Sequence, residues 1–168
     1  SSLREQIQLF FTVANSLSMP VTHVKFHGQL YNEAAQNKRL GNMLINMIYS
    51  IDQNLSIIGP ANSLLEFITK NSSIPFISEA FIDRRYQEDS SLVNRNQGNA
   101  LIESIQDQVH QARSIVIDEK VMTVSNKNIK IKADTLCIHG DNQNSLNAVK
   151  AVSEMLKKEN IQIHPPSL

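Results

Sequence analysis

Hydrophobic residues along the chain switch between two kinds of spacing. Where they recur every three or four positions they predict helices, over about 3–18, 33–50, 64–68, 99–117 and 143–158. Short β-branched runs bounded by Pro, Gly or polar residues predict strands at 21–26, 55–59, 74–78, 135–138 and 161–163. Strands that alternate with helices in this way predict a parallel sheet covered by helices, and therefore an α/β fold.

Two stretches interrupt the alternation. Residues 79–98 show no clean period and carry many charges, and a connection of this length is typical of a functional loop. Residues 121–124 and 129–132 flank a polar turn, which predicts a β-hairpin within an insertion at 120–132. We expect both features to belong to a single domain that spans residues 1–168.

Composition narrows the class of protein. The chain has 168 residues, of which 41% are hydrophobic and 19% charged, as in ordinary soluble domains. Lys and Arg together number 16 and so do Asp and Glu, and this balance argues against a nucleic-acid partner. No apolar run approaches the roughly 20 residues that span a bilayer, and the N-terminus has no secretory-signal pattern. Cys137 is the single cysteine and is expected to be an inert core residue. These features predict a cytoplasmic protein without a membrane partner.

Polar side chains follow three of the predicted strands. His27 and Gly28 follow the first, Glu79 and the Asp83–Arg84 pair follow the third, and His139, Gly140 and Asp141 follow the fourth. Because sites in parallel α/β folds form beyond the carboxyl ends of the strands, these residues are expected to gather at one rim. A lone histidine at a strand end is commonly structural, whereas two His-Gly pairs at equivalent ends favour a functional role.

The residues alone do not decide whether this rim binds a metal ion or an anionic ligand. Imidazole and carboxylate groups of His27, His139 and Asp141 would suit a metal ion, but their spacing is not specific, and we predict no metal. Lys25 within an apolar strand and Arg84 in a charged loop each suit an anionic ligand. A surface-facing lysine and a solvated loop of charge pairs explain the same residues equally well.

Four segments carry a resemblance to a known family. HVKFHGQLYNEAA at 23–35, EAFIDRRY at 79–86, SLVNR at 91–95 and TLCIHGDN at 135–142 resemble the HVKPHGxLYNxAA, ExFADRxY, SLVPR and TxCxHGDN motifs of the LamB/YcsF family, also known as the A subunit of 5-oxoprolinase. They occur in the family's order across nearly the whole chain. Departures at Phe26, Ile82, Arg85 and Asn94 leave the polar motif positions in place.

The resemblance covers the C-terminal two-thirds of a family member, because the family's N-terminal DLNxDxGE, GFHAGD and GAHP motifs are not found here. It implies a (β/α) barrel of the TIM-like, glycoside hydrolase-deacetylase type. We expect this barrel to be incomplete, since its N-terminal strands are missing. Exposed strand edges and apolar helix faces in such a barrel would favour a partner or a homo-oligomer.

The function that the resemblance implies is a subunit of ATP-dependent 5-oxoprolinase. This hydrolase acts on cyclic amides, opens the lactam of 5-oxoproline to L-glutamate, uses ATP with Mg, and works with two further subunits. The motif positions imply catalytic roles for His27, His139, Asp141, Glu79 and Asp83, and substrate-binding roles for Lys25, Arg84, Tyr86 and Arg95. Two alternatives remain: a metal-dependent, deacetylase-like hydrolase, and a truncated, non-catalytic subunit that only binds a partner.

Overall fold

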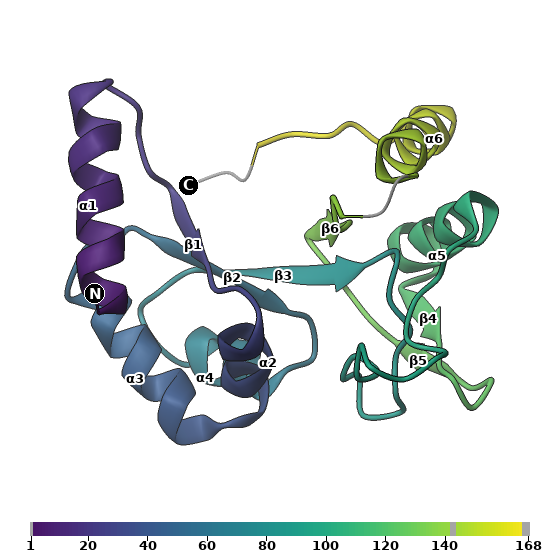
Figure 1. Cartoon of the computed structure of the whole chain (residues 1–168), viewed down its shortest axis with the longest axis horizontal. Helices are drawn as coiled ribbons and strands as arrows, with labels where there is room; N and C mark the ends of the chain where they lie inside the picture. Colours follow the sequence, from purple (N-terminus) through teal and green to yellow (C-terminus); the bar gives the residue numbers. More distant parts are fainter. Residues whose placement is uncertain (1, 142–143, 166–168) are drawn as a thin grey trace. The chain divides into compact units, whose positions relative to one another are not determined.

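The computed structural model describes residues 2–141 and 144–165 (Figure 1). Six helices and six strands are described, and in chain order they are α1 (Leu3–Ser16), β1 (His23–Lys25), α2 (Gln29–Gln36), α3 (Lys38–Tyr49), β2 (Ser56–Pro60), α4 (Leu64–Lys70), β3 (Phe76–Phe81), α5 (Ile105–Asp118), β4 (Lys120–Met122), β5 (Asn128–Lys130), β6 (Thr135–Cys137) and α6 (Ser145–Lys158). The described residues divide into two compact units, 2–59 with 64–77, and 60–63 with 78–141 and 144–165.

Four strands are hydrogen-bonded in the order β1-β2-β3-β6. β1 pairs in parallel with β2, placing Val24 opposite Ile57, and β3 pairs in parallel with β6, placing Ala80 opposite Leu136. Parallel neighbours require a crossover connection, which is why helices separate these strands along the chain. The α/β fold with a parallel sheet, predicted from the hydrophobic pattern, is confirmed.

In the first unit, α2, α3 and α4 pack against one another (Figure 1). Their apolar stripes recur at helical spacing and face a core to which the β2 segment also contributes. Large side chains that are at most 2% exposed here include Leu44, Ile48, Leu55, Ile57 and Leu65.

The single helix expected over 33–50 is two helices, α2 and α3. Asn37 separates them with an extended backbone, and its side chain accepts a hydrogen bond from the Leu40 N–H at 3.1 Å. Asparagine competes with the helix for backbone hydrogen bonds and is a favoured N-cap. Apolar residues keep helical spacing on both sides of Asn37, so the hydrophobic pattern did not indicate this break.

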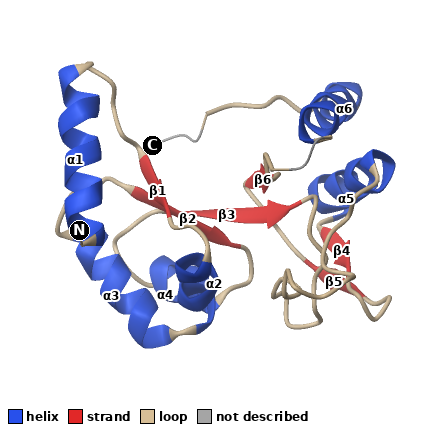
Figure 2. Cartoon of the chain, viewed as in Figure 1, coloured by secondary structure: helices blue, strands red, loops and turns tan. Residues whose placement is uncertain are grey.

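In the second unit, α5 and α6 lie side by side, and the β4–β5 hairpin lies against α5 (Figure 1). The apolar cluster of this unit draws on the segment after β3 and on both helices: Ile82, Ala112, Val152, Met155 and Leu156. Cys137 is partly buried in β6. Residues 82–104, drawn mostly as loop in Figure 2, connect β3 to α5.

The third strand lies later in the chain than predicted. Because Pro75 has no N–H to donate, the strand begins at Phe76, and it continues through Phe81. Glu79, expected after the strand, is therefore inside it, opposite Thr135 and only 4% exposed.

The strand predicted at 161–163 is wrong. The Ile161 N–H donates to the Leu156 carbonyl at 2.9 Å, and Asn160 has a left-handed φ of 58°. These features belong to the end of α6, so the backbone of Ile161 terminates a helix and is not free to pair with a strand. Gln143, expected at the start of that last helix, lies outside the described residues.

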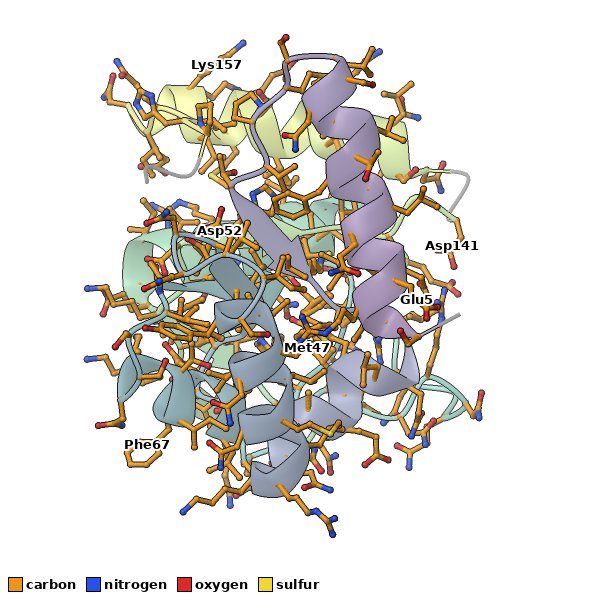
Figure 3. All side chains as sticks on the ribbon, turned by 90° about the vertical axis from the view of Figure 1, so that its left-hand side faces the viewer. Glu5, Met47, Asp52, Phe67, Asp141 and Lys157 are labelled. Atoms are coloured by element: carbon orange, nitrogen blue, oxygen red, sulfur yellow. The ribbon has the colours of Figure 1, made fainter. Side chains whose placement is uncertain are left out.

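Several large apolar side chains are exposed. On α1 and its C-cap residue they are Leu9, Phe10, Val13 and Leu17, each more than half exposed. The Phe67 ring also points away from the ribbon of α4 (Figure 3). Within residues 2–141 and 144–165, no helix has both the length and the apolar character needed to cross a membrane.

Candidate active site

Two side chains beyond the carboxyl ends of β3 and β6 meet in the second unit. The strand register places Phe81 opposite Cys137, so the residues two positions further on, Asp83 and His139, come side by side. Asp83 Oδ2 accepts a hydrogen bond from the His139 backbone N–H at 2.9 Å and lies 2.8 Å from His139 Nδ1. The His139 ring also stacks on Phe81, with centroids 5.6 Å apart.

This pairing determines what the imidazole can do. Asp83 is 6% exposed, and its carboxylate faces Nδ1, so the hydrogen on Nδ1 is the one that completes the contact. The lone pair of a neutral His139 is then on Nε2. An Asp–His pair in this arrangement orients the ring and stabilises the imidazolium that forms when Nε2 takes up a proton.

Asp83 also has an oxygen that is not used within the chain. Among the described residues, no donor reaches its buried Oδ1. A buried acceptor without a partner is costly, so Oδ1 is available to accept a hydrogen bond from a water molecule or a ligand at this site.

A cavity of about 410 Å³ reaches Asp83, and His139 is not among the described residues that line it. Its lining comprises Asp83, Arg95, Leu101, Ile102, Glu103, Asp141 and Asn144. The Arg95 guanidinium donates to the Asp141 carboxylate, and both side chains are about half exposed. This hydrogen bond lowers the pKa of Asp141, so the carboxylate stays ionised. Three carboxylates and one guanidinium therefore supply the charge of the cavity wall.

Arg84 and Tyr86, both predicted to bind substrate, are buried in the loop that carries Asp83. Arg84 Nη2 donates to the Val93 carbonyl at 2.6 Å, and burial lowers the pKa of its guanidinium. The Tyr86 hydroxyl accepts the Phe81 N–H at 2.7 Å, and burial raises the pKa of this phenol far above its usual range. Neither residue lines the cavity, and both connect distant parts of the loop backbone.

Lys25 and His27 belong to the first unit. The Lys25 ammonium lies 5.8 Å from the centroid of the Tyr31 ring, a cation–π distance, and His27 is exposed. Gly28 has a φ of 63°, as expected for a sharp turn after the histidine, and is the N-cap residue of α2. Gly140 does not share this conformation within the described part of the chain.

Direct contacts or a shared cavity wall bring together four of the nine predicted residues: Asp83, His139, Arg95 and Asp141. Arg84 follows Asp83 in the loop, but its guanidinium donates to the Val93 carbonyl. Glu79 lies buried in the same unit and raises the pKa of Tyr86. Sequence reasoning missed Gln111, whose amide contacts the backbone on both sides of Asp83. A polar residue on the buried face of a predicted helix was the available signal.

A metal ion needs several ligand side chains close together, and a nucleotide needs positive charge for its phosphates. Over residues 2–141 and 144–165, no three side chains of His, Cys, Asp or Glu gather closely enough to hold a metal ion. With one basic residue against three acidic ones, the cavity does not fit the phosphates of ATP. Asn142, the last residue of the fourth motif, lies outside the described residues.

The fold and the site define the chain as a parallel α/β protein with an Asp–His pair at the strand ends. Comparison with known proteins identifies its family. A sequence model of the LamB/YcsF family matches residues 1–167, and the chain belongs to this family. It is 35% identical over 161 residues to the A subunit of 5-oxoprolinase from Haemophilus influenzae (strain PittEE), and 37% identical over 145 residues to the corresponding protein of Staphylococcus aureus (strain JH9).

These relatives are longer than the chain. The matches cover 96% and 86% of this chain but 66% and 58% of the Haemophilus and Staphylococcus proteins. The crystal structure of a lactam utilization protein from Thermus thermophilus superposes with a TM-score of 0.86 at 24% identity, covering 96% of this chain and 64% of that one. This likeness shows a shared fold, consistent with a half-barrel of TIM-like type.

Proposed function

We propose that this chain supplies the hydrolytic site of a 5-oxoprolinase, in which a cyclic amide is opened to an amino acid. Family membership and relatives named as the A subunit of 5-oxoprolinase support the reaction. The observation that carries the proposal is the position of Asp83, which holds His139 by two hydrogen bonds and also lines the cavity.

His139 acts as the general base in this proposal. Its Nε2 takes a proton from water while the water oxygen forms a bond to the lactam carbonyl carbon. The carbon–nitrogen bond then breaks, and the proton is returned to the leaving nitrogen, giving a carboxylic acid and an amine. The acid proton then passes to the amine, so that the products are a carboxylate and an ammonium ion. Asp83 keeps the ring oriented and stabilises the transient imidazolium.

The cavity wall offers one partner for each end of this reaction. The substrate carries a single carboxylate, and the Arg95 guanidinium, now paired with Asp141, would exchange that partner to bind it. Ring opening creates an amine that becomes an ammonium ion, and the acidic side chains Glu103 and Asp141 favour that charge. Arg95, rather than the buried Arg84, is therefore our candidate for carboxylate binding.

ATP enters only at the level of the complex. Since the cavity does not fit a triphosphate, we propose that nucleotide and Mg are bound by two partner subunits and not by this chain. Lys25, His27 and Glu79 are not part of the cavity lining, and they stay candidates on the family motifs alone.

The test is ATP-dependent release of glutamate from 5-oxoproline by this chain mixed with its two partner subunits. We expect His139→Gln and Asp83→Asn to reduce turnover at least about 100-fold, by loss of the general base and of its orientation. His110→Gln, on the exposed face of α5, is the matched control and should keep full turnover. Undiminished release by His139→Gln would refute the proposed role.

A further inference from the structure

Gln111 is a buried polar residue that the proposed chemistry does not use. It lies in the middle of α5 and is 8% exposed. Its Nε2 donates to the Phe81 carbonyl at 2.8 Å and to the Arg84 carbonyl at 2.8 Å, and lies 3.4 Å from the Ile82 carbonyl. One amide group thus contacts the backbone on both sides of Asp83.

The backbone at this point needs such a donor. After Phe81 the chain leaves β3, and the carbonyls of Phe81 and Arg84 both accept a hydrogen bond from the Gln111 amide. An amide nitrogen has two hydrogens, which match the two contacts at 2.8 Å. Without them, two buried carbonyls would lose their partner, and the segment would move to regain hydrogen bonds.

Movement of this segment would reach His139 through Asp83. The Asp83 side chain makes two contacts with His139, at 2.9 Å and 2.8 Å, and its backbone is held by the Ile102 N–H, which donates to the Asp83 carbonyl at 2.9 Å. A displacement of even part of an ångström at Asp83 would lengthen these contacts.

We infer that Gln111 is a positioning residue: by holding the backbone on both sides of Asp83, it fixes the carboxylate that keeps His139 in its Nδ1–H form. This role rests on the proposed function for its catalytic consequence, but the geometry that it predicts exists without substrate. Gln108, one turn earlier on α5, donates to the Ile102 carbonyl at 2.6 Å and therefore acts on Asp83 one step further away.

The direct test is the protonation state of the His139 ring, read by long-range ¹H–¹⁵N NMR of the chain alone. The His139 signals are identified by their loss in His139→Gln. At a pH where the imidazole is neutral, we expect the wild-type ring to carry its hydrogen on Nδ1, which faces Asp83. In Gln111→Met, which has a similar shape but no donor, we expect a mixture of both neutral forms. Gln108→Met should shift the populations less.

The control separates positioning from lost stability. Ile115 is buried on the same helix and is 2% exposed, and Ile115→Val should lower stability while leaving the His139 signature as in wild type. A folded Gln111→Met chain with the wild-type signature would overturn the inference. Should that variant fail to fold, Gln111→Asn is measured instead, and a wild-type signature there would overturn it as well.

The consequence for catalysis is measured separately in the reconstituted glutamate-release assay. We expect Gln111→Met to lower kcat by about tenfold to 100-fold, as small displacements of catalytic groups do, with KM changed less than about twofold. A changed His139 signature together with no release by the wild-type chain would leave Gln111's positioning role intact and defeat the proposed function. An unchanged kcat beside an active wild type would defeat the catalytic part of the inference.

Discussion

Asp83 illustrates how much of this site depends on a single side chain. Its Oδ2 serves both the backbone and the ring of His139, and its Oδ1 accepts nothing from the described residues. The neighbouring polar residues have different tasks, because Arg84 and Tyr86 use their polar atoms on the loop backbone. At the scale of the residue, membership of a motif therefore did not tell which side chains line the cavity and which ones hold the loop backbone.

Tyr86 provides the first prediction at this scale. Tyr86→Phe removes the hydroxyl that accepts the buried Phe81 N–H, and we expect the free energy of unfolding to fall by about 1–3 kcal/mol. Urea denaturation measures the change. Tyr49→Phe, at a residue that is 44% exposed, is the control and should leave stability nearly unchanged. Equal losses in the two variants would show that the Tyr86 hydroxyl contributes nothing specific.

The Arg95–Asp141 pair predicts a pH dependence. Arg95 lowers the pKa of Asp141, so the stability that this pair adds is present above the usual aspartate pKa. It is lost as the pH falls through the lowered pKa of Asp141. Arg95→Gln should raise that pKa to its usual range, as measured by ¹³C NMR titration of the carboxyl group. The exposed Arg85→Gln is the control, and a low Asp141 pKa that survives Arg95→Gln would contradict the assignment.

At the scale of the element, the ends of helices follow short polar signals. Ser2 and Glu5 form a capping box at the start of α1, Asn37 caps α3, and Ser104 caps α5 by accepting the Asp107 N–H at 3.3 Å. The α5 cap explains why that helix begins at Ile105 and not near residue 99. Hydrophobic spacing alone would continue a helix through such residues, whereas the capping side chain sets the residue at which the helix begins.

The Asn37 cap provides a prediction for this scale. Asn37→Ala removes the acceptor for the Leu40 N–H and should lower the free energy of unfolding by about 1 kcal/mol. Asn46→Ala, at an exposed interior position of α3, is the matched control and should be neutral or slightly stabilising, because Ala has the higher helix propensity. Thermal or urea denaturation compares the two. A destabilisation by Asn46→Ala as large as that by Asn37→Ala would argue against the cap.

At the scale of the whole molecule, the long connection between β3 and α5 is ordered by contacts that are remote in sequence. Tyr86 forms bridges with both Leu92 and Thr123, and Arg84 pairs with Leu101. Such contacts form only when the second unit is assembled. The apolar face of α1, consisting of Leu9, Phe10, Val13 and Leu17, shows the opposite situation, since it stays exposed within the described residues.

This α1 face predicts poor solubility. A contiguous exposed apolar surface favours association and binds apolar dyes. We expect Leu9→Lys with Val13→Lys to increase solubility and to reduce the fluorescence of bound anilinonaphthalene sulfonate. Phe67→Lys, which removes a single exposed ring on α4, is the control and should have a smaller effect. Unchanged dye binding in the α1 variant would show that another surface binds the dye.

The sequence by itself determined the α/β class, most helices and strands, the hairpin strands and the polar residues at the strand ends. Hydrophobic spacing predicts these features because a helix or strand that buries one face needs apolar residues at fixed intervals within its own short segment. Family motifs added the expectation of a lactam-opening function and pointed to Asp83, His139, Arg95 and Asp141 together. The homo-oligomer, the two partner subunits and the ATP requirement stay predictions.

Only the tertiary structure decided which motif residues meet and what each one does. The pairing of Asp83 with His139 depends on the register between β3 and β6, which lie more than fifty residues apart in sequence. Burial diverted Arg84 and Tyr86 to the loop backbone, and Gln111 acquired its role because α5 lies next to the end of β3. Hydrogen-bond partners distant in the chain leave no periodic trace, so sequence patterns alone did not reveal them.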